Sequence, residues 1–501
     1  SSPLQTVLEV LSHDARQPQR RLPDELVPTL IDTLSEDDVA RASAFATRNG
    51  LLAELARFQK LHEGLKQARQ NPVRRSEGLD LYFYNWRVGR LEALAHGEFR
   101  FTYDPGWTIG LSGLPRDRSP AFEGRALPAF LDNLLPEGWA ESRLRAAYKI
   151  AREDTFELLK TTQKYLSNLT LRPDGFDASN LVLDRVGVRL EDLTRNADIL
   201  EARELIGRDP DSAELWLDLR RRSATRLSGV QPKLPVHLDM TGGDVTIALG
   251  DLTTTTTHIL KLPAPEFPQI VENEWATMEL ARRIGQTVPA VRRVTFQKNS
   301  PVRSPALLVE RFDLPPSLEE PTELLLLEDA ASLIGIGRDD KYSPSHERVL
   351  DALRGSGVPQ GHLATYFDHV AYSWIVGNGD LHAKNVSVVH AIAPGRLGSP
   401  PRKTGVRYAP LYDLVCTRLV IRDDLFALTL NGRRNKLQAG DFVALARRWG
   451  WTRAEAVERI EGLAERVRAN IQDVVRSSGL VKNRQDHFVS IVSGNISLLL
   501  G

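Results

Sequence analysis

The sequence predicts an α+β protein in which strand-rich regions are separate from a long helical region. Segments with the apolar alternation of strands lie at 79–103 and again at 223–313. Helical periodicity dominates from about 328 to the end. The chain has 501 residues, of which 42% are hydrophobic and 26% charged. This composition is that of a globular protein, and the length suggests roughly three folding units.

The charge balance limits the possible partners. Lys+Arg and Asp+Glu number 65 each, so the formal net charge is +0. A protein that binds nucleic acid with its whole surface usually has a basic excess, so we expect DNA contact only through local basic patches or a partner. The single cysteine, Cys416, excludes an internal disulfide and a cysteine-rich metal site, and it indicates a reducing, cytoplasmic location. No apolar run approaches the length of about 18 residues that would predict a membrane span.

Two regions precede the main strand-rich segment. Residues 1–78 are predicted to be a helical N-terminal extension, and nothing in them indicates a role. Residues 79–175 are predicted to form a small α+β subdomain. Its strands are expected at 79–84, 88–94 and 98–103, followed by helices over 127–150 that break at Pro136 and Gly138.

Three further regions complete the chain. Residues 176–222 are polar and are predicted to form a helical connector that ends in three arginines, 220–222. Residues 223–313 are predicted to be strand-rich, with one helix at 271–284. The strands are expected at 233–238, 244–249, 258–262, 291–297 and 306–310. Residues 314–501 are predicted to be helical, and Thr452 and Glu455 form a capping box at the start of one helix.

The segment 377–386, GNGDLHAKNV, is where the chemistry is expected. Asp380 and Asn385 are separated by four residues, which is the D-x-x-x-x-N spacing of a kinase catalytic loop. In such a loop the carboxylate accepts the proton of the attacking hydroxyl, and the amide oxygen binds Mg²⁺. Asp413 follows an apolar stretch and is a candidate for the second metal ligand, as in a DFG motif.

Two upstream residues complete this set. Lys261 lies within the apolar strand Ile259–Leu262, where a buried ammonium needs a carboxylate or a phosphate. Glu274, in the following predicted helix, is its natural ion-pair partner. Each residue alone has an ordinary structural explanation, such as a water-facing lysine or a turn-capping aspartate. The order strand Lys, helix Glu, catalytic loop, second Asp is that of protein kinases, so we predict a two-lobed protein-kinase-like fold. A G-x-G-x-x-G loop is missing, which excludes an ordinary eukaryotic-type kinase.

With these and other motifs, residues 79–501 resemble the HipA family, the serine/threonine kinase toxins of bacterial toxin–antitoxin pairs. The matching segments of the nucleotide and catalytic regions are 227–233, 258–263, 271–274, 309–313, 380–385 and 411–413. Those of the N-terminal subdomain are 88–91, 99–107 and 130–136. Because the motifs are separated and in order, the resemblance implies the HipA-like fold, with a small N-terminal domain, a nucleotide lobe and a helical C-terminal lobe.

The resemblance also implies roles for particular residues. It implies transfer of the γ-phosphoryl group of ATP, with Mg²⁺, to a protein serine or threonine. Asp380 would be the catalytic base, Lys261 would bind the phosphates, and Asn385 and Asp413 would be the Mg²⁺ ligands. The remaining nucleotide-binding residues would be Ser228, Gly229, Val230, Gln231, Lys233, Glu274, Glu310, Arg311, Phe312, His382 and Lys384. The implied partners are an aminoacyl-tRNA synthetase as substrate and a helix-turn-helix antitoxin, with DNA bound mainly through that antitoxin.

The chain departs from the family pattern in places. Members are regulated by phosphorylation of a loop serine, but Arg226 stands at that position, which leaves Ser228 as the candidate autophosphorylation site. Residues 163–169 replace a glycine-containing turn of the relatives. Two other functions stay open. One is a small-molecule phosphotransferase, since 379–385 also looks like the loop of aminoglycoside and choline kinases. The other is a non-catalytic, nucleotide-binding regulatory subunit of a DNA complex.

Overall fold

The computed structural model describes most of the chain beyond residue 76. The described residues are 41, 77–94, 97–162, 168–174, 199–206, 231, 233–239, 245–249, 256–264, 266–296, 305–315, 321–395 and 400–501. The chain divides into two units, Ser1–Ser76 and Glu77–Gly501. Apart from residues 41, 77 and 78, the predicted N-terminal extension lies outside the described residues, as do 163–167, the arginines 220–222, Arg226 and the loop residues Ser228, Gly229 and Val230. No helix within the described ranges has the length and apolar character needed to cross a membrane.

The N-terminal subdomain is built on a five-stranded antiparallel sheet of order β4-β3-β2-β1-β5. Its strands are β1 (Gly78–Phe83), β2 (Trp86–Ala93), β3 (Phe99–Tyr103), β4 (Phe122–Gly124) and β5 (Leu169–Pro173). The first three are the predicted strands. The helices are α5 (Ala129–Asp132), α6 (Gly138–Tyr148) and α7 (Thr155–Thr162). The predicted break lies between α5 and α6 and includes Pro136, as expected. Gly138 does not interrupt a helix but is the first residue of α6.

The apolar core of this sheet extends into the C-terminal region. Its buried side chains, among them Leu81 and Phe101, belong to one apolar cluster with Leu324 and Leu326 of β12 (Leu324–Asp329) and Ile392 of β13 (Ser387–Ala393). Burial of such apolar side chains is the main favourable term in folding. The subdomain is therefore held rigidly against the part of the chain that carries the catalytic loop.

The nucleotide-lobe region forms a closed barrel of order β10-β11-β9-β7-β8-β6. Five of its strands coincide with the predicted ones: β7 (Lys233–Asp239), β8 (Val245–Leu249), β9 (His258–Lys261), β10 (Val291–Phe296) and β11 (Ala306–Glu310). Helix α9 (Ile270–Arg283) interrupts them as expected. The sixth strand, β6 (Ile199–Ile206), corrects the expectation of a helical connector, because it pairs in parallel with β10 and β8 and closes the barrel.

The C-terminal region is helical but contains a sheet that the helical expectation missed. Strands β12, β13 and β14 (Arg402–Tyr408) form a three-stranded antiparallel sheet. The helices are α10 (Ala330–Ile334), α11 (His346–Gly355), α12 (Gln360–Val376), α13 (Ala439–Arg447), α14 (Arg453–Ser477) and α15 (Lys482–Leu500). The predicted capping box of Thr452 and Glu455 starts α14.

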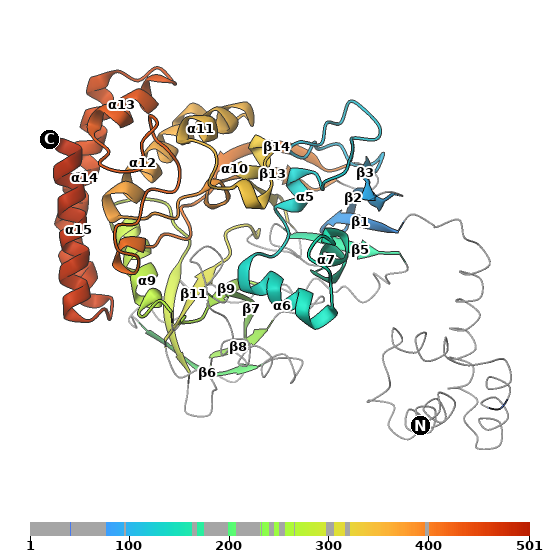
Figure 1. Ribbon diagram of the computed structural model, residues 1–501, viewed down its shortest axis with the longest axis horizontal. Coiled ribbons are helices and arrows are strands. Elements are labelled where there is room, and N and C mark those ends of the chain that lie inside the picture. The colour runs from blue at the N-terminus through green and yellow to red at the C-terminus, as the bar shows by residue number, and fades with distance from the viewer. Residues whose placement is uncertain are drawn as a thin grey trace. The chain divides into compact units, whose positions relative to one another are not determined.

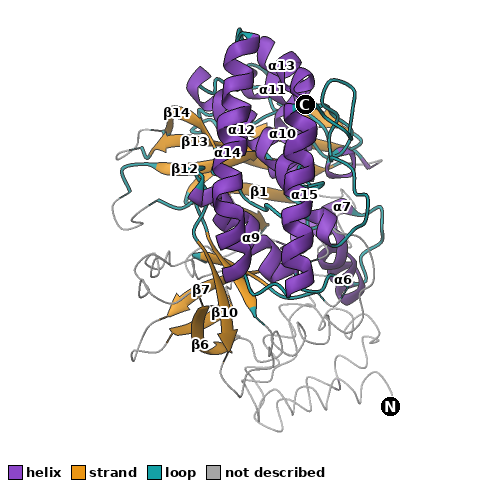
Figure 2. Ribbon diagram, turned by 90° about the vertical axis from the view of Figure 1, so that its left-hand side faces the viewer, coloured by secondary structure: helices purple, strands orange, loops and turns teal. Residues whose placement is uncertain are grey.

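Figure 1 shows the barrel strands in the lower part of the view and the helices of the C-terminal region above them and to the left. The N-terminal sheet lies at the right. In Figure 2, α14 and α15 run side by side along the outside, and α12 lies behind them. Helix α12 is buried along most of its length. This burial gives the segment that follows it, residues 377–386, a rigid support.

Candidate active site

Two lysines face each other on adjacent barrel strands. Lys233 of β7 and Lys261 of β9 are register partners in an antiparallel ladder. Like charges directly opposite each other destabilise a sheet, so this pair needs an anion. Both ammonium groups donate to the Asp413 carboxylate, Lys233 Nζ to Oδ2 at 3.0 Å and Lys261 Nζ to Oδ1 at 2.5 Å. The barrel thus presents a two-lysine anion site where β7 begins and β9 ends.

Lys261 is also paired with Glu274 of α9, as predicted. Both side chains are almost fully buried. Burial raises the pKa of the Glu274 carboxyl, and the neighbouring Lys261 acts in the opposite direction. The pKa of Asp413 is held well below its usual range by Lys233 and Lys261, although burial alone would raise it. Asp413 is therefore a permanent carboxylate at neutral pH.

The position of Asp413 is set by the chain around it. Three residues later, the backbone of Cys416 makes two bonds to the Asn273 side chain, N–H to Oδ1 at 3.0 Å and carbonyl from Nδ2 at 2.9 Å. Asn273 precedes Glu274 on α9, so one helix positions both the ion pair and the Asp413 loop. Asp413 itself has φ of 56°, a left-handed conformation that is uncommon outside glycine and often found at functional sites. The buried thiol of Cys416 has a pKa raised to about 12 by burial, as expected for a small core side chain.

The catalytic-loop candidate begins where α12 ends. Gly377, in the left-handed conformation, terminates the helix. A Cβ on Gly379 would lie 2.6 Å from the Leu425 carbonyl oxygen, so only glycine fits at this close approach. The loop then closes on itself: the N–H of Asp380 donates to Asn378 Oδ1 at 3.0 Å, and Asn385 Nδ2 donates to the Asp380 carbonyl at 2.8 Å. The D-x-x-x-x-N spacing thus brings Asp380 and Asn385 into direct contact.

The carboxyl of Asp380 has a partner outside the loop. Tyr342 donates its hydroxyl to Asp380 Oδ1 at 2.6 Å. Burial raises the pKa of Asp380 to about 6, and the Tyr342 hydrogen bond limits that rise. The His382 ring packs edge-on against Tyr342, with centroids 5.0 Å apart, and burial lowers its pKa to about 3. His382 is therefore neutral, and its Nε2 lies 3.9 Å from Asp380 Oδ1, too far for a hydrogen bond.

These groups open into one cavity of about 460 Å³, a size typical of small-molecule sites. Its walls contain every predicted site residue that the structure describes: Gln231, Lys233, Lys261, Glu274, Glu310, Arg311, Phe312, Asp380, His382, Lys384, Asn385 and Asp413. Residues from the N-terminal subdomain, Phe130, Asn133, Leu134, Leu135 and Glu137, also line it. The sequence interpretation assigned that subdomain no part in the site.

The predicted nucleotide-binding residues 310–312 line the cavity, but several of their polar groups bind other parts of the protein. The guanidinium of Arg311 is buried and binds the Asp313 carboxylate at 2.9 and 2.7 Å and Thr256. The N–H groups of Glu310 and Arg311 donate to the carbonyls of residues 290 and 257, each at 2.9 Å. Phe312 also lines the cavity. Phe312 itself packs on Tyr412, with ring centroids 5.5 Å apart.

The donor set fits a hard cation that arrives with a phosphate. Asn385 uses its Nδ2 within the loop, which leaves its amide oxygen for a ligand, and Asp413 supplies a carboxylate. Among the described residues no group of three or more His, Cys, Asp or Glu side chains could hold a metal ion by itself. Mg²⁺ typically binds to one or two carboxylates together with substrate phosphates, and the residues present match this arrangement.

Sequence reasoning missed Tyr342, Lys341, Glu137 and Asn273. The break at Pro136 marks the place of Glu137, but its partners lie more than 200 residues away. Asn273 stands beside a predicted residue, yet a buried asparagine on a helix gives no spacing signal. Only the folded arrangement identifies these four side chains.

The buried pair of Lys261 and Glu274 leads to a stability prediction. We expect Lys261→Met to destabilise the protein by about 3–5 kcal/mol at pH 8, because it leaves Glu274 buried without its cation. Protonation of Glu274 relieves this cost. The pKa of that carboxyl is already raised by burial, and without Lys261 it rises further, so the loss of stability should be smaller at pH 5 than at pH 8. Urea unfolding at the two pH values measures both effects.

Lys233→Met is the matched control. The Lys233 side chain is 41% exposed, and Asp413 keeps Lys261 as a partner, so the expected loss is below about 1 kcal/mol. Equal stability losses in the two variants, or a larger loss for Lys261→Met at pH 5 than at pH 8, would contradict this account.

Comparison with known proteins agrees with this geometry. The chain matches the family model of the HipA-like C-terminal domain over residues 225–471 and that of the HipA N-terminal domain over residues 79–166. The protein named "Putative kinase Y4dM" of Sinorhizobium fredii is 28% identical over 62% of this chain and 68% of its own length. "Putative kinase Y4mE" of the same organism is 28% identical over 66% of this chain and 75% of its own length.

A solved structure confirms the predicted fold class. HipA of Shewanella oneidensis, in a complex with HipB and its operator DNA, superposes with a TM-score of 0.60 at 21% identity, covering 84% of this chain and 96% of that chain. The two family matches together cover more than half of the chain, with the N-terminal domain first and the C-terminal domain second. The chain belongs to the HipA family and has its kinase-like α+β fold.

Proposed function

We propose that this protein is a serine/threonine protein kinase that transfers the γ-phosphoryl group of ATP to a protein hydroxyl. The observation that carries the proposal is the convergence of Lys261, Glu274, Asp380, Asn385 and Asp413 on one cavity, from a barrel on one side and a helical region on the other. These residue types in this order are those that position phosphates and a hydroxyl nucleophile in kinases.

Each group has a task that follows from its surroundings. Lys261 and Lys233 form the cationic end of the cavity, where the phosphates of ATP would be bound. Asp380 lines the same cavity, with a pKa of about 6 that keeps it mostly ionised at neutral pH. It would accept the proton as the hydroxyl oxygen of the substrate forms its bond to the γ-phosphorus and the bond to the β,γ-bridging oxygen of ATP breaks, with ADP leaving. The apolar residues of the barrel wall and Phe312 would enclose the base.

Mg²⁺ would be held by Asn385 and Asp413 and would neutralise the negative charge of the phosphates. Asp413 is already an ionised carboxylate, because Lys233 and Lys261 keep its pKa low. Asn385 is fixed by its bond to the Asp380 backbone. Both ligands therefore need little reorganisation, which favours tight binding of a nucleotide with its cation.

The substrate and partners follow from the family resemblance. We propose an aminoacyl-tRNA synthetase as the protein target, so that phosphorylation would inhibit translation, and a helix-turn-helix antitoxin as partner. The Shewanella HipA structure contains HipB and operator DNA. The formal net charge of +0 supports DNA contact mainly through such a partner rather than through this chain alone. If loop autophosphorylation occurs, Ser228 is the expected site.

The test of the reaction uses purified protein, γ-labelled ATP, Mg²⁺ and a bacterial lysate. We expect label on protein serine or threonine with the wild type, and a loss of at least about 100-fold with Asp380→Ala, because the general base is missing. Asp339→Ala is the matched control, since this carboxylate is on the surface near the site but does not line the cavity. It should retain activity.

The same assay separates the alternatives. Label transferred only to small molecules would indicate a small-molecule phosphotransferase. Nucleotide binding without any transfer would indicate a regulatory subunit. Transfer to protein that survives Asp380→Ala would contradict the assigned base.

The pKa of Asp380 gives a second prediction. The base must be ionised to accept a proton, so kcat/KM should rise with pH through about 6 and then reach a plateau. Tyr342→Phe removes a hydrogen bond that favours the ionised form. Its midpoint should therefore move to higher pH, by about one unit. A Tyr342→Phe profile that coincides with the wild type, or moves to lower pH, would contradict this role.

A further inference from the structure

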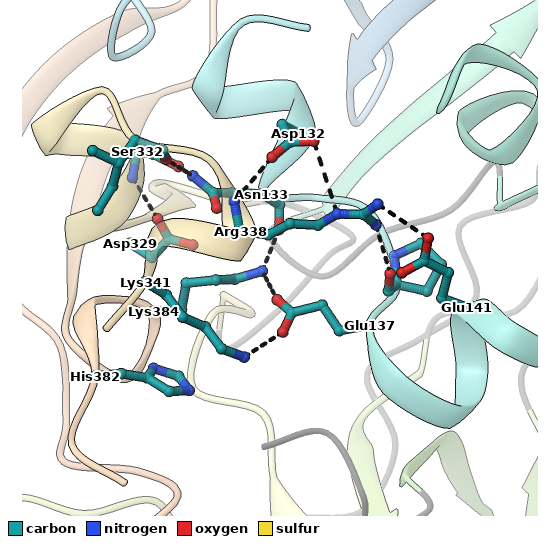
Figure 3. A network of polar contacts seen from close by, with 12 residues as sticks. Asp132, Asn133, Glu137, Glu141, Asp329, Ser332, Arg338, Lys341, His382 and Lys384 are labelled. Atoms are coloured by element: carbon teal, nitrogen blue, oxygen red, sulfur yellow. Dashed lines mark hydrogen bonds and ion pairs between the residues drawn. The ribbon is translucent and has the colours of Figure 1, made fainter. Parts of the chain in front are cut away.

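Glu137 extends from the N-terminal subdomain to the catalytic loop. It stands at the start of α6, and its two carboxylate oxygens bind two different lysines: Oε1 accepts from Lys384 Nζ and Oε2 from Lys341 Nζ. Figure 3 shows Glu137 between the ends of these two side chains. All three residues line the cavity that contains Asp380. The contact is thus in the wall of the candidate active site and not at a distant interface.

The three charged side chains of this contact are largely shielded from solvent. The side chains of Glu137, Lys341 and Lys384 are 21, 9 and 15% exposed. Burial acts to raise the pKa of Glu137, but the two lysines outweigh it and lower the pKa to about 2. Glu137 is therefore ionised throughout the pH range in which the protein would act. Two ammonium groups brought together without this carboxylate would repel each other.

Both lysines are connected directly to the catalytic loop. Lys384 immediately precedes Asn385, and its Nζ also donates to the Asn133 carbonyl at 2.8 Å. The carbonyl of Lys341 accepts the N–H of Ala383 at 3.1 Å. Lys341 in turn precedes Tyr342, the residue that binds the Asp380 carboxylate. A displacement of either lysine would therefore change the position of Asp380 or Asn385.

The surrounding interface keeps Glu137 in place. Arg338 donates its N–H to Asp132 Oδ2 at 2.9 Å and its guanidinium to the carbonyl of residue 136 and to Glu141. Asn133 donates to Ser332 and to the carbonyl of residue 336. Figure 3 shows these contacts on the side of the network away from His382. They fix the subdomain, and Glu137 forms ion pairs with the two lysines of the cavity wall.

We propose that Glu137 is a positioning residue for phosphoryl transfer, which holds Lys384 and Lys341 beside Asp380 so that the N-terminal subdomain forms part of the catalytic centre. This inference rests on the proposed function. Without Glu137, the Lys384 ammonium would keep the neutral carbonyl of Asn133 and the weaker attraction of the Asp329 and Asp132 carboxylates, and it would be held less firmly beside Asn385. The N-terminal subdomain is then required for the reaction through a specific side chain and not only for stability.

The test is a kinetic double-mutant cycle in the full chain with γ-labelled ATP. Glu137→Gln keeps the shape but loses the charge, and we expect it to lower kcat about tenfold or more with little change of KM for ATP. In a Lys384→Met background the same substitution should cost clearly less, at most about threefold, because the Lys341 contact is then the one left to lose. Glu141→Gln, in the same interface but outside the cavity, should leave kcat within about twofold of wild type. If Glu137→Gln does not fold, Glu137→Asp replaces it in the cycle.

A readout without turnover separates this inference from the proposed function. Hydrogen exchange of peptides covering 380–386 should become faster in Glu137→Gln and stay unchanged in Glu141→Gln, whether or not the protein proves to be a kinase. Unchanged exchange and kcat in Glu137→Gln would overturn the inference. So would an equal cost of that substitution with and without Lys384. Absent transfer by the wild type would instead count against the proposed function alone.

Discussion

Lys233 and Lys261 face each other across two neighbouring barrel strands, and the Asp413 carboxylate binds both. This arrangement is the electrostatic constraint on which the rest of the site depends. Two opposed cations are unfavourable in a sheet unless an anion is delivered to them, and the anion comes from a loop of the other lobe. The Glu274 carboxylate neutralises the charge of the buried Lys261 ammonium. A phosphate would meet the same cationic pair, so the contacts that stabilise the protein also prepare it for a nucleotide.

The two sides of the cavity are joined by polar contacts that are short and buried. The Asn273 side chain ties α9 to the Cys416 backbone and so positions the Asp413 loop. On the opposite side, Glu137 ties the N-terminal subdomain to Lys384. A shared apolar core between that subdomain and β12 and β13 keeps this second connection rigid. The catalytic loop is thus held from two directions, which is the preorganisation that phosphoryl transfer needs.

Much of this could be predicted from the sequence, because the relevant signals are local. The D-x-x-x-x-N spacing predicted that Asp380 and Asn385 act together, and the apolar setting of Lys261 predicted a buried ion pair with Glu274. The capping box of Thr452 marked the start of α14. The strand β6 was wrongly expected to be helical, because the region 176–222 around it is mostly polar and its partners β8 and β10 follow it by tens of residues. Tyr342 and Glu137 were not predicted as site residues for the same reason, because no short sequence spacing connects them to Asp380 or Lys384.

The most direct measurement is the identification of the lysines that lie against the phosphates of bound ATP. An ATP analogue with an acyl group on its terminal phosphate transfers that group to a nearby lysine amine, which forms an amide and releases ATP, and mass spectrometry then locates the modified residue. We predict modification at Lys261 or Lys233, lost when unmodified ATP with Mg²⁺ is added in excess. Modification confined to lysines outside the cavity, or modification that excess ATP does not prevent, would contradict the account.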